Sequence, residues 1–276
     1  YNVYLGQEQI KKGFEEDYKC IKTVIPYLKN IKILNDDDDK LTTVIKTRLA
    51  LNINKLTILN EPNTFVSLKE LHTNKLGNEM EKNLWISYAL TLARKQEVNT
   101  YNKNNLLGYL PEIRAMTTQK ISTFLPRLKE ILSECGICYV LLPYLSKSNI
   151  YGATKWLNNS TVMLAMSNRT GRLDSFWFTL FHELAHVTFE HKRYMLLNYE
   201  GDIDVEADNF AKNQLIHQPD WDNFIKENAF DVQSIIKFAK SINIHPCIVL
   251  GRLEKEKIIP FGKFEKEIVI KYNIFQ

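Results

Sequence analysis

The sequence predicts an α+β fold in which a helical N-terminal region precedes a small sheet packed against helices. Three observations predict it. Residues 1–103 repeat apolar side chains at helical spacing, residues 137–167 contain three short strand-like runs, and residues 176–191 return to a helical pattern. We therefore divide the chain into a helical N-terminal region, residues 1–103, and an α+β domain, residues 104–276.

The N-terminal region is expected to form three helices. Apolar residues recur at positions i, i+3 and i+4 over residues 6–30, 40–52 and 78–98, and Asn-rich or Asp-rich segments separate these stretches. Core packing and a groove for a partner would both produce such stripes, and we expect core packing. The acidic run at residues 36–39 is expected to be a solvated loop.

The second region is expected to begin with a helix and to continue into the sheet. The helix covers residues 121–136, and Pro126 is expected to kink or break it. The strand-like runs follow at residues 137–145, 149–157 and 160–167.

The C-terminal segment, residues 232–259, is expected to form two helices joined by a short turn, with Pro246 opening the second helix. Helix, turn and helix is also the outline of a DNA-reading motif. The second helix carries Ile248, Val249 and Leu250. We therefore favour packing against the core over DNA reading.

Length and composition limit the class of protein. The chain has 276 residues, 45% of them hydrophobic, which is enough to bury a sizeable core. No apolar run approaches the roughly 18 residues that a membrane helix needs, and the N-terminus lacks the apolar core of a signal peptide. We therefore expect a cytoplasmic protein with no membrane partner.

The charge pattern does not predict a nucleic-acid-binding surface. The formal net charge is +4, from 36 basic and 32 acidic residues, and the lysines are spread along the chain. The four cysteines do not predict a disulfide framework in a chain of this length. Cys135 and Cys138 form a single C-x-x-C where a helix meets a strand, so we expect buried, reduced thiols.

Residues 182–186 read His-Glu-Leu-Ala-His inside the apolar helical run at residues 176–191. This is the H-E-x-x-H zinc signature. His182 and His186 lie one turn apart on the same face of a helix, so both can present an imidazole nitrogen to one tetrahedral Zn²⁺. Two imidazoles and a carboxylate would be costly to bury in so apolar a helix without a metal. We therefore expect Zn²⁺ as the cofactor.

Glu183 is the candidate catalytic residue. It follows His182 in the motif and falls beside the metal without ligating it. Zn²⁺ lowers the pKa of a bound water to roughly 7, and a carboxylate within hydrogen-bond reach can take the proton as the water attacks a carbonyl carbon. The predicted reaction is amide hydrolysis. A structural zinc site has no use for such a base, whereas hydrolysis does, so Glu183 favours an enzyme.

A third zinc ligand is expected from the acidic cluster that follows. The candidates are Glu200, Asp202, Asp204, Glu206 and Asp208. Glu206 lies one turn before Phe210, near what we take to be the buried side of a helix, whereas Asp202 and Asp204 are interpreted as helix caps or solvated acids. We therefore favour Glu206.

Several blocks of the sequence resemble the ImmA/IrrE family of zinc metallopeptidases. They are FWFTLFHELAHVTFEH at residues 176–191, VEADNFAKNQLI at residues 205–216, LLGYLPEIRAMT and GICYVLLPYL upstream, the lead-in at residues 151–183, and the C-terminal stretch at residues 235–261. Two positions depart from the family pattern. Ala185 stands where the family often has Gly, and Leu-Ile-His-Gln-Pro ends the second helix, which places His217 near the cleft or on the surface.

The resemblance implies a zincin-like metallopeptidase domain, in which a small sheet packs on two zinc-bearing helices. It implies His182, His186 and Glu206 as zinc ligands and Glu183 as the catalytic acid/base. The implied function is a zinc-dependent endopeptidase that makes regulated cuts in a specific protein, such as a transcriptional repressor, an antitoxin or a similar regulator. DNA is expected as a partner only through a helix-turn-helix upstream of residue 1. The alternative is a non-enzymatic antitoxin or transcriptional regulator that uses the zinc site for structure or sensing.

Substrate contacts are less sharply predicted. A peptide substrate can dock as an added strand on the exposed edge of a sheet, and the strand just before the zinc helix, residues 162–167, is the expected edge. The candidates for binding a substrate carboxylate or a developing oxyanion are Arg169, Arg172, His191 and Tyr194. We expect the two arginines to be solvated.

Overall fold

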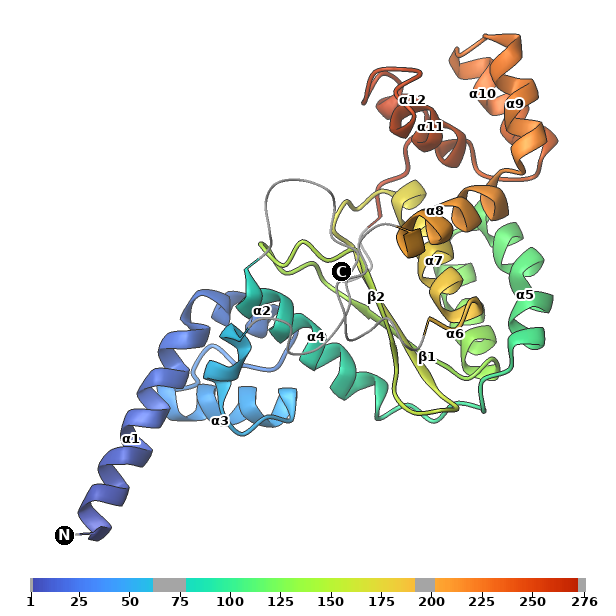
Figure 1. Cartoon of the computed structure of the whole chain (residues 1–276). Helices are drawn as coiled ribbons and strands as arrows, with labels where there is room; N and C mark the ends of the chain where they lie inside the picture. Colours follow the sequence, from blue (N-terminus) through green and yellow to red (C-terminus); the bar gives the residue numbers. More distant parts are fainter. Residues whose placement is uncertain (1, 62–77, 192–201, 273–276) are drawn as a thin grey trace.

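The computed structural model describes residues 2–61, 78–191 and 202–272 (Figure 1). A three-stranded sheet lies at its centre, formed by β1 (Ile137–Leu142), β2 (Gly152–Trp156) and β3 (Val162–Ser167) in the order β1-β3-β2. β1 pairs with β3 in parallel, and β2 pairs with β3 in the antiparallel direction. The described chain is therefore α+β, as predicted, with β3 in the middle of the sheet and β2 at one edge.

Helices form most of the remaining described chain. Those of the N-terminal region are α1 (Asn2–Ile21), α2 (Ile25–Asn30), α3 (Lys40–Leu51) and α4 (Glu79–Ala93). They are followed by α5 (Lys103–Ala115), α6 (Ile121–Glu134), α7 (Leu173–Thr188), α8 (Asp202–Leu215), α9 (Gln218–Glu227), α10 (Val232–Ser241), α11 (Pro246–Lys255) and α12 (Glu265–Ile268). The three predicted N-terminal helices are confirmed, and a short 3-10 turn divides the first of them into α1 and α2.

The sheet separates two hydrophobic cores. In β3, Leu164 and Met166 belong to one core, and Met163 and Ala165 belong to the other, as expected where successive side chains point to opposite faces. The first core includes residues of α5, α6 and α7, and the second includes residues of α1 to α4. The N-terminal region therefore covers one face of the sheet, and α7 lies against the other. The boundary between residues 103 and 104 stays a prediction. Helices of both regions pack against this sheet, one region on each face.

Helix α4 is buried on nearly all sides instead of along one stripe. Even its charged residues Glu81 and Lys82 are buried. The physical reason is its position, because α4 contacts both the sheet and the other N-terminal helices.

The acidic run at residues 36–39 is only partly a solvated loop. Asp36 is fully exposed, but Asp38 pairs with Lys46 at 2.6 Å. Asp39 caps α3 by accepting a hydrogen bond of 2.7 Å from the backbone N–H of Thr42.

Helix α6 runs without interruption through Pro126, so the expected break is absent. Cys135 and Cys138 follow it as buried free thiols, as predicted. Burial raises the pKa of Cys135 to about 11 and also raises the pKa of Cys138, which makes both sulfurs poor nucleophiles.

The C-terminal helices α10 and α11 have the predicted helix-turn-helix outline. Ile248, Val249 and Leu250 of α11 are buried, and α11 packs against α7. The interpretation of this segment as packing against the core is confirmed. Within the described ranges, no helix is both long enough and apolar enough to cross a bilayer.

Candidate metal centre

The start of α7 is fixed by a buried ion-pair network. The guanidinium of Arg172 binds Asp174 through two hydrogen bonds of 3.1 Å and binds Glu254 of α11 at 2.6 Å. Gly251 of α11 lies so close to Asp174 that a side chain there would collide with its carboxylate. Arg172 was expected to be solvated, but only 7% of the residue is exposed. It therefore holds α7 in place and does not face a substrate.

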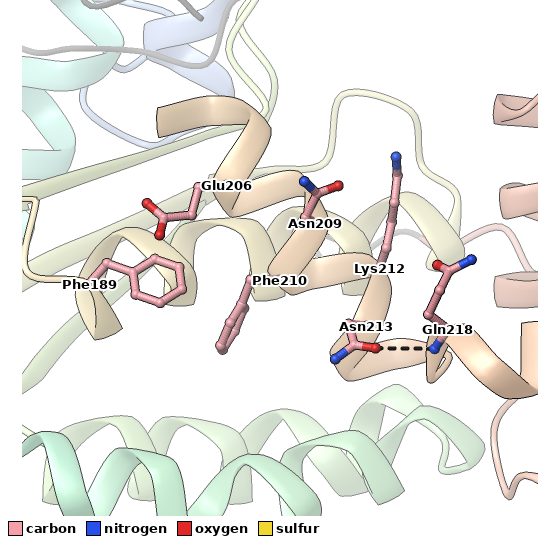
Figure 2. Close-up of a pocket in the computed structure, with 7 residues that line it drawn as sticks. All are labelled: Phe189, Glu206, Asn209, Phe210, Lys212, Asn213 and Gln218. Atoms are coloured by element: carbon pink, nitrogen blue, oxygen red, sulfur yellow. Dashed lines mark hydrogen bonds between the residues drawn. The ribbon is translucent and has the colours of Figure 1, made fainter. Parts of the chain in front are cut away.

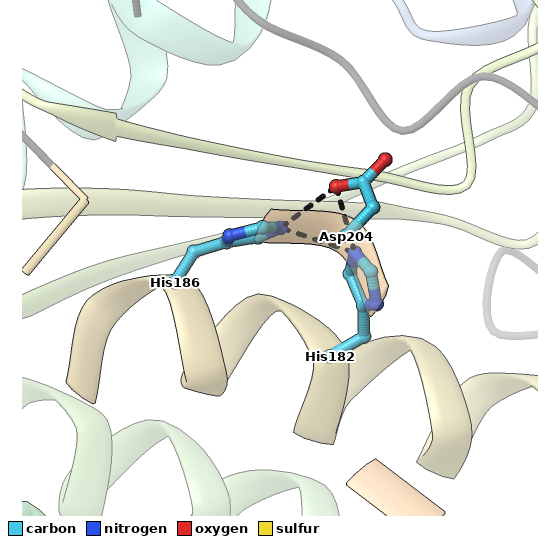
Figure 3. A group of neighbouring side chains, drawn as sticks. All are labelled: His182, His186 and Asp204. Carbon is cyan, nitrogen blue, oxygen red and sulfur yellow. Dashed lines mark hydrogen bonds and ion pairs between the residues drawn. The ribbon is translucent and has the colours of Figure 1, made fainter. Parts of the chain in front are cut away.

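The two motif histidines lie on α7 beside the first half of α8 (Figure 3). His182 is fully buried, and its Nε2 lies 3.1 Å from Nε2 of His186. Oδ1 of Asp204 lies 3.8 Å from Nε2 of His182 and 3.6 Å from Nε2 of His186. Together these three residues form a group that could hold a metal ion.

The spacing of these donor atoms fits a tetrahedral ion. Metal–ligand bonds of about 2.0–2.2 Å place neighbouring donors roughly 3.3–3.6 Å apart around a tetrahedral centre. The three observed separations, 3.1, 3.6 and 3.8 Å, lie close to this range. Two imidazoles and one carboxylate also leave a fourth position for water or substrate, as in catalytic metal sites.

Asp208 orients the first histidine. Its Oδ1 lies 2.7 Å from Nδ1 of His182, and it is one turn beyond Asp204 on α8. A carboxylate on Nδ1 fixes the imidazole tautomer with its lone pair on Nε2, the atom that faces His186 and Asp204. Asp204 and Asp208 therefore lie on one face of α8. Asp204 belongs to the donor group, and Asp208 contacts Nδ1 of His182.

The structure does not bring Glu206 into this group. Its side chain is 54% exposed, and Oε2 lies 3.4 Å from Nε2 of His191. The direction follows from the inward stripe of α8, whose buried residues are Ala207, Ala211 and Leu215. A helix turns about 100° per residue, so Asp204 falls within this stripe and Glu206 falls outside it.

The sequence contains a feature that predicts Asp204 as the inward-facing acid, namely the two alanines of α8. The interpretation that favoured Glu206 used Phe210 to mark the buried side. Phe210 is only partly buried, whereas Ala207 and Ala211 are fully buried, and α8 packs against α7. Small residues allow close helix approach, so the alanines mark the inward face. Among the other candidates, Glu200 and the side chain of Asp202 lie outside the described part of the chain.

Glu183 points from α7 toward β2. The hydroxyl of Thr154 donates a hydrogen bond of 2.7 Å to Oε2 of Glu183, and the carboxylate is almost fully buried. A Cβ atom added to Gly152 would lie 2.5 Å from Oε1 of Glu183. Gly152 therefore leaves the space that Glu183 occupies, and Thr154 fixes the plane of its carboxylate.

The expected substrate edge at residues 162–167 is wrong. This segment is β3, which is paired on both sides and has all six residues buried. The strand that reaches Glu183 is β2, and β2 pairs only with β3 among the described strands.

A surface pocket of about 460 Å³ is lined mainly by residues of α8 (Figure 2). Its lining residues are Phe189, Glu206, Asn209, Phe210, Lys212, Asn213 and Gln218. None of the three donors lines it, but Glu206 does. The pocket therefore lies on the Glu206 side of α8 and does not contain the donor group.

The remaining candidates have other surroundings. The guanidinium of Arg169 stacks on the ring of Tyr151 at 4.5 Å. His191 contacts His186, and burial lowers the pKa of the His191 ring, which favours its neutral form. His217 is exposed at the start of α9, which agrees with a surface position. Tyr194 lies outside the described residues.

Comparison of the chain with protein-family models, with curated proteins and with solved structures found no match.

Proposed function

We propose that the protein is a zinc-dependent endopeptidase with a zincin-like catalytic domain. The observation that carries the proposal is the donor group of His182, His186 and Asp204, with Glu183 next to it on the same helix. The resemblance to the ImmA/IrrE family supports the same reaction. In this proposal Asp204 replaces Glu206 as the third ligand, because Asp204 lies with the histidines.

A bound zinc ion supplies a water of lowered pKa and polarises the carbonyl group to be cleaved. Residues of the chain transfer the protons. Glu183 accepts the proton of the attacking water and then donates it to the leaving amine, as a general base and a general acid. Its burial and the hydrogen bond from Thr154 hold the carboxylate in one orientation. Such positioning reduces the entropy lost on reaching the transition state.

The substrate is proposed to bind as an extended peptide along β2. This strand lies at an edge of the described sheet and carries Gly152 and Thr154, both of which contact Glu183. Backbone hydrogen bonds to an edge strand would place a peptide bond next to the catalytic carboxylate. A repressor, an antitoxin or a related regulator with an accessible extended segment is the proposed substrate class.

The first test is the zinc content of the purified protein, measured by elemental mass spectrometry for wild type, Asp204→Ala and Glu206→Ala. We expect one zinc per chain in wild type, loss of zinc in Asp204→Ala and retention in Glu206→Ala. The opposite order for the two variants would make Glu206 the third ligand. A wild type that binds no zinc when zinc is supplied would overturn the proposal.

The second test is hydrolysis of a mixed peptide library, followed by mass spectrometry, for wild type and Glu183→Gln. We expect Glu183→Gln to keep its zinc and to lose cleavage by several orders of magnitude, because it cannot accept the proton. A zinc-loaded wild type that cleaves neither peptides nor candidate regulators would favour the non-enzymatic alternative.

A further inference from the structure

A third histidine lies directly behind one of the proposed metal ligands. Nδ1 of His191 is 2.9 Å from Nδ1 of His186, on the side of the ring opposite to the donor atom Nε2. The other ring nitrogen of His191, Nε2, lies 3.4 Å from Oε2 of Glu206. The three side chains therefore form a row from the surface of α8 to the donor group.

The end of α7 places His191 in this position. The backbone N–H of His191 bonds to the carbonyl of His186 at 3.1 Å, and the N–H of Glu190 bonds to the carbonyl of Val187 at 3.1 Å. Glu190 between them has a positive φ of 52°. This pattern is a Schellman motif, which brings the second residue past the helix end back onto the last turn. Here that contact joins two imidazole rings.

The protons along the row can have only one consistent order. A metal-binding Nε2 of His186 carries no proton, so the proton of the neutral ring is on Nδ1. That N–H donates to Nδ1 of His191, whose own proton must then be on Nε2. Nε2 of His191 faces the carboxylate of Glu206, which can only accept. Glu206 thus favours the His191 tautomer with its proton on Nε2, and that tautomer can accept the Nδ1 proton of His186.

We propose that His191 is a positioning residue for His186, and that Glu206 holds His191 in the tautomer that accepts the His186 proton. The inference rests on the proposed metal centre and deepens it. Each histidine ligand then has its own partner at Nδ1. Asp208 serves His182 directly, and His191, supported by Glu206, serves His186. Such partners orient the ring and raise the basicity of the donor nitrogen.

This role separates Glu206 from Asp204, although both are acids in the first half of α8. A metal ligand is expected to be indispensable for binding, whereas a group that acts through His191 should change the affinity moderately. The proposal also implies that His191 does not stabilise the oxyanion, because both of its ring nitrogens already face protein groups.

The test is the zinc dissociation constant of the full chain, measured by competition with a chromophoric chelator at neutral pH. His191→Phe keeps a ring but removes the acceptor, and we expect it to weaken zinc binding about 10- to 100-fold. His191→Asn places an amide oxygen where Nδ1 lies and is expected to restore most of the affinity. Glu206→Gln is expected to weaken binding less than His191→Phe does.

Glu190→Gly is the matched control, because it keeps the helix end and both imidazoles, and Gly readily adopts positive φ. Its zinc affinity should equal that of wild type. Thermal melts of the zinc-free variants show whether each chain has folded, and long-range ¹H–¹⁵N NMR of wild type reads the His191 tautomer directly, with the proton expected on Nε2.

The outcomes separate the two proposals. Equal zinc affinity in His191→Phe and wild type would overturn the positioning role and leave the hydrolase intact. Equal weakening in His191→Phe and His191→Asn, or a His191 proton on Nδ1, would also overturn it. Zinc binding without any hydrolysis would overturn the hydrolase and leave the positioning role, and a wild type that binds no zinc would overturn both.

Discussion

Replacing Gly152 by Ala tests how Glu183 is held between α7 and β2. The added methyl carbon would lie 2.5 Å from Oε1, 2.7 Å from Cγ and 2.9 Å from Cδ of Glu183. Ordinary non-bonded contacts lie at about 3.5–4.0 Å, so the carboxylate and the strand must separate by about 1 Å.

Two effects of opposite sign set the change in stability. Overpacking a well-packed interior costs about 1–3 kcal/mol, and replacing Gly by Ala regains about 0.4–1 kcal/mol through the unfolded state. We expect Gly152→Ala to lower the free energy of unfolding by about 1–2 kcal/mol. For the proposed hydrolase, a shift of about 1 Å in the proposed general base Glu183 is also expected to lower kcat about 100-fold. Zinc affinity should hardly change, because the three atoms nearest to the added methyl carbon all belong to Glu183, which is not a proposed ligand.

Gly108→Ala is the matched control. Gly108 lies within α5, and a Cβ added there would meet nothing within 4 Å. Ala in a helix interior is favoured over Gly by about 0.5–1 kcal/mol, so this variant should be more stable than wild type. Urea denaturation of the zinc-free proteins measures both changes. If Gly152→Ala proves as stable as Gly108→Ala, Glu183 does not press against β2 and the reasoning fails.

Three further predictions concern the scaffold. Arg172→Met leaves the buried Glu254 and the mostly buried Asp174 without their cation, and should lower the free energy of unfolding by about 3–5 kcal/mol in urea denaturation. A loss below about 1 kcal/mol would contradict the buried network. Burial lowers the pKa of His245, so the unfolded chain takes up a proton first and stability should fall as the pH drops below the ordinary histidine range. His245→Asn, which can still accept the N–H of Cys247, should flatten that slope in melts taken at several pH values, and an unchanged slope would assign it to other groups. Cys135, whose pKa burial raises to about 11, should resist iodoacetamide at mildly alkaline pH until urea unfolds the protein, which mass spectrometry of the alkylated peptide would show.

The elements with a strong local pattern were predictable from the sequence. The helices at α1 to α4, the run that becomes α7 and the pair α10 and α11 all follow apolar spacing, because one face of each segment must be buried. The three strand-like runs also became the three strands, although each strand is shorter than the run that predicted it.

Only the part of the candidate site that lies on a single helix, α7, was predictable from the sequence. The positions of His182 and His186 follow from the i, i+4 geometry of a single helix, and the structure brings them together. The order of the strands does not follow from any local pattern, so the interpretation of β3 as an edge was wrong. Strand order depends on which hydrogen-bonding partners lie beside each strand after the chain has folded.

The sequence by itself determined that two histidines and a glutamate share one buried helix, and that an acidic helix follows them. Only the tertiary structure decided which acid joins the histidines. That choice depends on how α8 is rotated against α7, and the buried residues Ala207 and Ala211 mark the inward face of α8. The same rotation directs Asp204 and Asp208 to the histidines and leaves Glu206 facing His191. A rotation between two helices is a property of their contact, and neither helix encodes it alone.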